Sequence, residues 1–146
     1  MIIKQASIQH IDELAILFAQ YRVFYKHSFD AEAAKQFLIE RITNRESIIF
    51  IAIDAGQTAG FAQLYPSFSS VSIAKIWILN DLFVGAEHRR KGIAQALLNE
   101  AVEYCKKSGR KRTVLSTAYD NFIAQKLYEK LGFNRSDFYN YELEIG

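Results

Sequence analysis

The feature of the sequence that most directly indicates a chemical role is a cluster of basic residues beside a glycine. Arg89, Arg90 and Lys91 precede Gly92, after an apolar stretch and before a helical pattern that includes the small Ala94. A helix N-terminus presents free backbone N–H groups and a partial positive charge, so it can bind an anion. Glycine lets the backbone approach a phosphate closely, because it has no Cβ. The pattern predicts an anion site; the alternative interpretation is a solvated basic face.

The elements on either side of this turn are predicted from apolar spacing. Residues 73–84 form a long, nearly continuous apolar run, which is typical of a strand at the centre of a sheet. Residues 92–107 carry apolar side chains at helical spacing and end with two lysines and a glycine. The basic turn is therefore expected to join a buried strand to the start of an amphipathic helix.

The other periodic segments predict the remaining elements. Strands are expected over residues 2–6, 47–53, 58–65, 73–84, 113–117 and 138–145. Helices are expected over residues 11–25, 31–42, 92–107 and 121–131, with Ser7, Asp30 and Asp120 or Asn121 near their starts. The last strand alternates polar and apolar residues, so one of its faces should be wet.

This order, β-α-α-β-β-β-α-β-α-β, predicts the fold class. Consecutive strands imply antiparallel pairs, and the strand–helix–strand unit around Gly92 implies a parallel pair. An α+β (mixed α/β) fold follows, with a central mixed, twisted sheet and helices on both faces. The sequence contains no repeat, low-complexity segment or linker, so residues 1–146 are expected to form one domain.

Composition narrows the class of protein. Half of the 146 residues are hydrophobic, and 18 basic against 16 acidic residues leave a formal charge of +2. No apolar run reaches membrane-spanning length and the N-terminus lacks a signal-peptide layout, so a cytoplasmic protein without membrane contact is expected. The single cysteine, Cys105, excludes an internal disulfide and a cysteine-rich zinc site, and its helical pattern favours a core position. No metal site is expected.

Three segments together resemble a known family. Residues 89–94, Arg-Arg-Lys-Gly-Ile-Ala, resemble the signature of the GNAT superfamily of N-acetyltransferases, written Gln/Arg-x-x-Gly-x-Gly/Ala. Residues 79–84 resemble the family's central strand, and residues 121–133 match its second motif. The order of elements also fits the GNAT fold, so the resemblance covers nearly the whole chain. It is specific in the last two-thirds and loose in the first third.

The resemblance implies acetyl-coenzyme A as co-substrate. The turn would cradle the pyrophosphate through backbone amides, and the pantetheine arm would pair with the exposed edge of the central strand, where the next strand splays away. The side chain of Asn121 would approach the cofactor, as would Tyr128. The implied cofactor-binding residues are Leu82, Phe83, Val84, Arg89, Arg90, Lys91, Gly92, Ile93, Ala94, Asn121 and Tyr128.

The chemistry of amine acylation then assigns catalytic candidates. Tyr128 lies where the family often has a tyrosine that protonates the leaving thiolate; the alternative is a tyrosine packed on a helix face. Residues 65–70 and 78–84 resemble spermidine/spermine acetyltransferases, but those enzymes have glutamate where Asn80 stands. The base would then be water, Asp81 or another carboxylate. Strand alternation predicts that Asp81 faces away from Asn80, so the alternative for Asp81 is a structural role.

The acceptor is predicted less sharply than the donor. Tyr21 and Tyr25 share a helix face, and with Phe24 and Asn80 they are the candidate substrate-binding residues, although core packing explains the aromatics equally well. We expect a small-molecule primary amine, from a polyamine, an amino acid or a similar compound. The alternatives are a protein or peptide N-acetyltransferase and a catalytically silent acyl-CoA-binding module.

A nucleic-acid-binding module is a further alternative. Residues 88–91 and 106–112 are basic clusters, but aromatic residues are not interleaved with them as in single-strand binders. No nucleic-acid partner is therefore expected. A homodimer is expected, both from family habit and because an exposed terminal strand edge invites pairing.

Overall fold

A five-stranded mixed sheet is the framework that positions the residues discussed above. The computed structural model describes residues 1–146 in two units, residues 1–116 and 117–146, and the sheet lies in the first. Its strands follow the order β1-β2-β3-β4-β5, antiparallel except for the parallel β4–β5 pair. They are β1 (Ile2–Gln5), β2 (Ile48–Asp54), β3 (Gln57–Ser69), β4 (Ala74–Val84) and β5 (Thr113–Val114).

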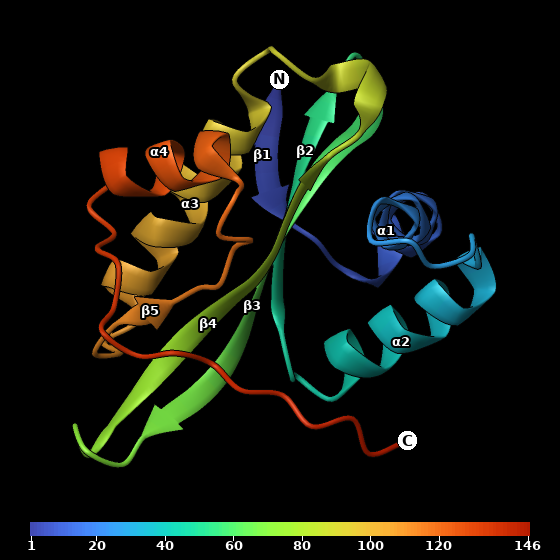
Figure 1. The fold of residues 1–146 in the computed structure, drawn as a ribbon. Helices are drawn as coiled ribbons and strands as arrows, with labels where there is room; N and C mark the ends of the chain where they lie inside the picture. The colour runs from blue at the N-terminus through green and yellow to red at the C-terminus, as the bar shows by residue number, and fades with distance from the viewer. The chain divides into compact units, whose positions relative to one another are not determined.

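Helices cover both faces of this sheet (Figure 1). On one face α1 (Ile11–Phe24) and α2 (Ala31–Thr43) pack against each other, and their buried residues join Ile49, Ile51 and Phe61 in one apolar core. On the other face α3 (Ile93–Lys107) lies against the sheet, where Tyr104 contacts the rings of Phe50 and Trp77. The predicted α+β class and mixed sheet are confirmed.

Local sequence explains where several elements begin and turn. The Asp30 carboxylate accepts a hydrogen bond from the Ala33 N–H at 3.0 Å and so caps α2. Ser7 caps a short 3₁₀ turn, η1 (Ile8–His10), that leads into α1. Ala55 and Gly56 both have positive φ, 51° and 77°, which is the backbone of a type I′ hairpin between β2 and β3.

Strand β3 runs four residues beyond the predicted end at Tyr65, through Pro66. The register explains why the proline is tolerated. Strand β2 begins at Ile48, opposite Leu64, so from Tyr65 onward β3 has a neighbour only in β4. A proline whose missing N–H faces an unpaired edge removes no hydrogen bond from the ladder.

The second unit, described by itself, contains α4 (Phe122–Lys130) and no strand. The predicted strand over residues 138–145 is wrong: this segment has no regular secondary structure. Its alternate apolar side chains, Tyr139, Tyr141, Leu143 and Ile145, are 85–94% exposed. Alternation is compatible with a strand, but a strand forms only where a neighbour supplies the hydrogen-bond ladder and a surface that buries one face. The predicted strand at 113–117 is likewise shorter, Thr113–Val114.

None of the helices is both long and apolar enough to cross a membrane.

Candidate active site

The basic turn connects the end of β4 to α3, as the sequence predicts. Gly85 follows Val84, a 3₁₀ turn η2 (Ala86–His88) comes next, and Gly92 is the residue before the first turn of α3. No side chain caps α3, and its first turn contains no acidic residue. Asp30 and Asn121 do cap α2 and α4. The leading N–H groups of α3 are therefore left for another acceptor.

The backbone of this turn is shaped for an anion. Arg90 and Gly92 both have positive φ, 64° and 77°, and a helical residue follows Gly92. Alternating left- and right-handed residues point successive N–H groups into one concavity, which is an anion-binding arrangement. A Cβ built on Gly92 would meet no atom within 4 Å, so the space above this backbone is open.

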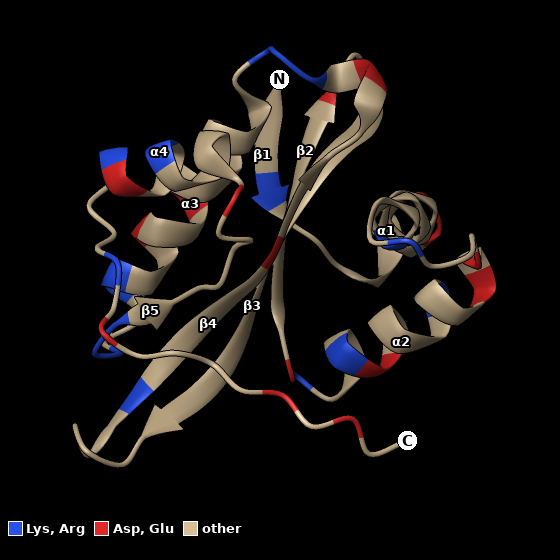
Figure 2. Cartoon of the chain, in the orientation of Figure 1, with Lys and Arg blue, Asp and Glu red and all other residues tan.

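The side chains of the basic cluster have divided roles. The Lys91 ammonium lies 3.0 Å from the Asp54 carboxylate, and the ring of His88 lies 3.4 Å from the same oxygen. These two partners hold the pKa of Asp54 below its ordinary value, the Lys91 hydrogen bond being the larger cause. The contacts tie the turn to the end of β2, and Figure 2 shows the basic loop at this end of the sheet. Lys91 therefore helps to hold the turn.

Arg89 is also engaged within the protein. Its Nε donates a hydrogen bond to the Val84 carbonyl at 3.1 Å, and its guanidinium lies 5.7 Å from the centre of the Phe83 ring. The side chain of Arg90, by contrast, is exposed. Of the three cations expected beside the anion, Arg89 and Lys91 thus have partners within the protein, and only Arg90 is uncommitted.

Strand β4 has a free edge next to the turn. Its parallel neighbour β5 pairs only with Trp77 and Ile78. From residue 79 to 84, β4 is paired on the β3 side alone. The residues expected to meet pantetheine, Leu82, Phe83 and Val84, thus lie opposite Ala62, Phe61 and Gly60 and have unpaired backbone on their other side.

A buried carboxylate lies just before this edge. Asp81 is 6% exposed, and three neutral side chains donate to it: Tyr21 at 2.8 Å, Gln63 at 2.8 Å and Asn80 at 3.1 Å. Hydrogen bonds to the charged form stabilise it. The protein thus supplies hydrogen-bond donors to both carboxylate oxygens of Asp81 although the residue is buried.

The contact between Asn80 and Asp81 corrects the prediction that the two residues face apart. Gln63 lies opposite Asp81 and Leu64 lies opposite Leu79, so Asn80 is an extra residue on β4. Such a bulge interrupts the period of two, and the Asn80 amide reaches the neighbouring carboxylate. The bulge is not visible in the sequence pattern.

Two tyrosines around this carboxylate are held in the neutral form. Burial, with the charge of Asp81 as second cause, raises the pKa of Tyr21 far above its ordinary value. The same two causes raise the pKa of Tyr65 to about 12. A phenol that stays protonated next to a carboxylate acts as a hydrogen-bond donor to it.

Three of the predicted acceptor residues lie at the C-terminal end of α1. Tyr21 contacts the rings of Tyr25 and Phe83, at 5.2 and 5.3 Å between ring centres. Phe24 lines a cleft of about 580 Å³ together with Phe83, Gly85 and Arg89. Tyr21, Tyr25 and Asn80 lie outside the lining of that cleft. The structure thus places Phe24 beside the turn and gathers Tyr21 and Asn80 at Asp81.

The second unit carries the other two predicted residues. The Asn121 side chain accepts a hydrogen bond from the Ala124 N–H at 3.2 Å and so caps α4. Tyr128 lies in the last turn of α4, with its ring 5.9 Å from that of Phe133. Gly132, at φ 100°, turns the chain so that the Phe133 N–H bonds the Tyr128 carbonyl at 3.1 Å. Gly132 therefore ends the helix in a left-handed conformation, and Phe133 folds back on its last turn.

Sequence reasoning missed three contributors. Gln63 and Tyr65 surround Asp81, and Gly60 lets β3 approach the end of β4, since a Cβ there would lie 2.8 Å from the Phe83 carbonyl oxygen. A polar residue inside the apolar run Phe61–Leu64 is the signal that identifies Gln63 in retrospect.

Cys105 is a core residue, as its helical pattern predicts. The Cys105 thiol is buried, and burial raises its pKa, so it stays protonated. No group of three or more histidine, cysteine, aspartate or glutamate side chains is placed to hold a metal ion.

Comparisons with known proteins agree with this geometry. Residues 12–133 match the family described as "Acetyltransferase (GNAT) family". The N-acetyltransferase YhfO of Bacillus subtilis, itself uncharacterized, is 43% identical over 99% of this chain and 98% of its own length. A probable acetyltransferase of Haemophilus influenzae is 31% identical over 88% of this chain and 87% of its own. A crystal structure of a probable acetyltransferase superimposes with a TM-score of 0.92 at 42% identity, covering 100% of this chain and 99% of that one.

Proposed function

The chain belongs to the GNAT family of acetyltransferases, and on that premise we propose that it acetylates a primary amine of a small molecule by direct attack in a ternary complex with acetyl-coenzyme A. The observation that carries this proposal is the uncapped N-terminus of α3, with Gly92 at its head, beside the free edge of β4. A polyamine or an amino acid is the acceptor class that we favour.

The residues of the turn fit the pyrophosphate of coenzyme A. The N–H groups from Gly92 to Ala94 would bind its oxygens, since no protein side chain caps them. The exposed side chain of Arg90 would add positive charge. The free backbone of Leu82–Val84 would pair with the amides of the pantetheine arm. When bound, acetyl-coenzyme A supplies a thioester carbonyl that an uncharged amine can attack.

Asp81 is the base in this proposal, and Tyr21 connects it to the acceptor. The carboxylate is buried, whereas the Tyr21 hydroxyl that donates to it is only partly buried. The ammonium of the acceptor would give a proton to the Tyr21 oxygen while the hydroxyl proton passes to Asp81. The amine would then form the C–N bond as the C–S bond breaks, and the second proton of its nitrogen would pass to solvent.

Tyr128 is the proposed acid for the leaving thiolate, and Asn121 the proposed contact from the start of the same helix. Both assignments rest on the match of residues 121–133 to the family's second motif. The phenol would give its proton to the leaving sulfur and regain one from solvent, while Asp81 would release the proton it had accepted to solvent. Alignment of both reactants in one cleft supplies the rest of the acceleration.

The acceptor class is supported by charge and by ring packing. Asp81 has three neutral hydrogen-bond donors and no cation among them, so its negative charge is available to an ammonium group. Tyr21 donates to this carboxylate, its ring contacts Tyr25 and Phe83, and Phe24 contacts Tyr25. Aromatic faces attract cations.

An acceptor screen tests the proposal. Thiol release from acetyl-coenzyme A is followed with polyamines, amino acids, aminoglycosides and peptides, and we expect saturable turnover with a polyamine or an amino acid. Turnover with peptides alone would replace the proposal by a protein acetyltransferase. Calorimetric binding of acetyl-coenzyme A without turnover would leave a silent acyl-CoA-binding module. Salt-dependent binding to a random duplex would support the nucleic-acid alternative.

The relay between Tyr21 and Asp81 predicts a non-additive pair of variants. Tyr21→Phe and Asp81→Asn are each expected to lower kcat by about 10²-fold, as for loss of a positioned base. The double variant should lose no more than either single one, because both steps belong to one proton path. Activity of both variants should recover as pH rises and solvent deprotonates the amine. A merely structural network would instead lower Tm and leave the kcat of the folded fraction unchanged.

A further inference from the structure

A second cavity lies away from the turn, where α2 ends and β2 begins. Its volume is about 340 Å³, and it shares no residue with the cleft beside Gly85. Ile42, Ile48, Pro66 and Trp77 form its apolar walls. Small-molecule sites in proteins have this size and this mostly apolar lining, with a few polar groups that fix the ligand.

Two arginines and no carboxylate line this cavity. The Arg110 guanidinium is held in place, 4.2 Å from the centre of the Trp77 ring and within 3.2 Å of the Ile76 carbonyl oxygen, to which it donates. It meets only neutral partners there. A guanidinium that is already oriented loses little freedom when it binds an anion.

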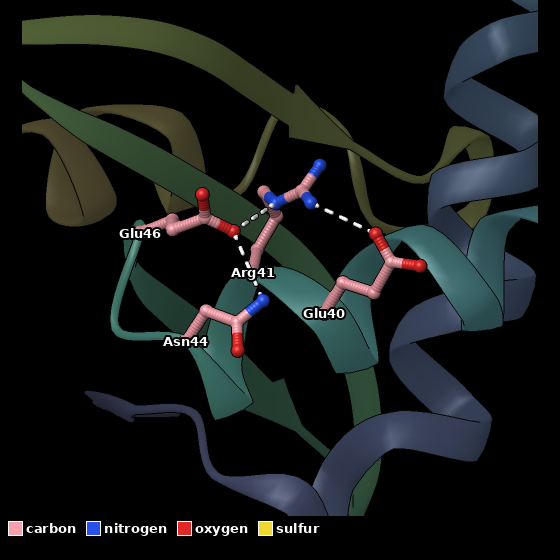
Figure 3. A network of polar contacts seen from close by, with 4 residues as sticks. All are labelled: Glu40, Arg41, Asn44 and Glu46. Atoms are coloured by element: carbon pink, nitrogen blue, oxygen red, sulfur yellow. Dashed lines mark hydrogen bonds and ion pairs between the residues drawn. The ribbon is translucent and has the colours of Figure 1, made fainter.

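The second arginine, Arg45, is not neutralised by its neighbours. The two acidic residues nearest to it in sequence, Glu40 in α2 and Glu46 in the turn, are paired with Arg41 at 3.0 and 3.2 Å (Figure 3). Asn44 donates to the same oxygen of Glu46 at 3.5 Å. No ion pair forms at Arg45, so the positive charge of both cavity arginines is uncompensated.

An independent sign of a ligand comes from Ser47, which also lines the cavity. This residue is 8% exposed, and its hydroxyl is buried without a hydrogen-bond partner in the protein. Buried polar atoms nearly always have a partner, so each exception needs an explanation. A ligand oxygen in the cavity would be the missing hydrogen-bond partner of the Ser47 hydroxyl.

We propose that this cavity binds a small organic carboxylate with an apolar body. The carboxylate would pair with Arg45 and Arg110 and accept from Ser47, since a guanidinium matches the planar geometry of a carboxylate. The body would lie on Ile48, Pro66 and Trp77. The apolar walls favour an organic acid over inorganic phosphate, whose entire surface needs polar partners.

Trp77 is the only tryptophan of the chain, so its fluorescence reports on this cavity. We would titrate the full chain with benzoate, with its neutral isostere benzamide and with inorganic phosphate, and confirm binding by calorimetry. Saturable binding of benzoate is expected, with benzamide and phosphate at least about tenfold weaker, the ratio that one lost charge-assisted interaction gives. Equal binding of benzamide, or of phosphate, would overturn the proposal.

Variants locate the site. Arg45→Gln and Arg110→Gln should each weaken benzoate roughly tenfold, whereas Arg22→Gln on α1 should change nothing. Arg45 is exposed, so its variant should fold even if Arg110→Gln disturbs Trp77. Gly92→Val and saturating coenzyme A should leave benzoate binding unchanged. If coenzyme A displaced benzoate, benzoate would be bound at the turn and the second site would be refuted. This outcome does not depend on the result of the acceptor screen.

Discussion

At the scale of single residues, the decisive feature is a buried carboxylate whose partners are all neutral. Asp81 receives hydrogen bonds from Tyr21, Gln63 and Asn80, and both of its oxygens are used. A buried ion pair would cancel the charge, whereas neutral donors stabilise the carboxylate and leave its net charge in place. That arrangement suits a group that must attract an ammonium or accept its proton.

Tyr65 provides a pH-dependent test of this environment. Its pKa is raised to about 12, first by burial and then by Asp81. For a neutral acid whose folded pKa is raised, the stabilisation is complete below the unfolded pKa of about 10 and is lost as pH rises toward 12. Tyrosinate absorbance should therefore show a late step near pH 12 that Tyr65→Phe removes. Asp81→Asn should move that step to lower pH; an unmoved step would show that the carboxylate charge does not reach Tyr65.

Tyr128→Phe separates chemistry from binding. The ring remains, so its packing on Phe133 changes little, and only the hydroxyl is lost. If Tyr128 protonates the thiolate, kcat should fall by about 10²–10⁴-fold while the calorimetric affinity for acetyl-coenzyme A stays within a few fold. The assay uses the acceptor identified by the screen. Wild-type turnover across the pH range would exclude Tyr128 as the acid.

At the scale of elements, β4 does the most to form the candidate site. Its first half is paired on both sides near Trp77 and Ile78, and its second half is paired only with β3. Between them, the bulge at Asn80 turns Asp81 toward α1. One strand thus supplies both the carboxylate and the free edge that leads to the turn.

Gly60 is expected to determine the position of the end of β4. In Gly60→Ala the new Cβ would lie 2.8 Å from the Phe83 carbonyl oxygen, a backbone atom that moves only with its strand. We expect a loss of about 1–3 kcal/mol of unfolding free energy, hence a Tm lower by roughly 2–8 °C, and weaker acetyl-coenzyme A binding. Thermal unfolding and calorimetry measure the two effects.

Gly85→Ala is the matched control for that variant. Its Cβ would meet the end of the flexible Leu17 side chain at 3.3 Å, and its φ of −58° suits any residue. It should therefore lower Tm less than Gly60→Ala does. If both alanines are tolerated equally, close approach of β3 and β4 is not what requires a glycine at residue 60.

At the scale of the whole molecule, the exposed C-terminal segment is the feature most in need of a partner. Tyr139, Tyr141, Leu143 and Ile145 are almost fully exposed although they alternate as in a strand. Such a segment gains both a ladder and burial by pairing with another strand. The prediction of a homodimer rests on this segment. That residues 1–146 form one domain also stays a prediction.

Light scattering at tens of micromolar protein tests the dimer. We expect twice the mass of the 16.8 kDa chain, and a shift toward the monomer when Tyr141 and Leu143 are both changed to serine. Serine removes apolar surface without introducing charge. Tyr119→Ser, at a residue that is also 92% exposed but lies outside the segment, is the control and should leave the mass unchanged. A monomeric wild-type protein would contradict the prediction.

The sequence by itself determined the elements and the turn, because both depend on local spacing. Helical periodicity identified α1, α2, α3 and α4, and an apolar run followed by Arg-Arg-Lys-Gly located the turn that leads to the uncapped start of α3. The alternation of polar and apolar residues gave wrong predictions where the chain does not form a regular, paired strand. Alternation predicted a terminal strand over residues 138–145, but that segment has no neighbouring strand. It also predicted that Asp81 faces away from Asn80, because the sequence pattern does not reveal the inserted residue of a bulge.

Only the tertiary structure decided which groups meet. Tyr21 and Asp81 are 60 residues apart in sequence, and Gln63 reaches Asp81 through the pairing register of β3 with β4. The cavity between Arg45 and Arg110 likewise joins the end of α2 to the loop before β5. Local patterns encode the backbone conformation of each segment, whereas contacts between distant segments depend on register, bulges and packing, which arise only when the elements are assembled.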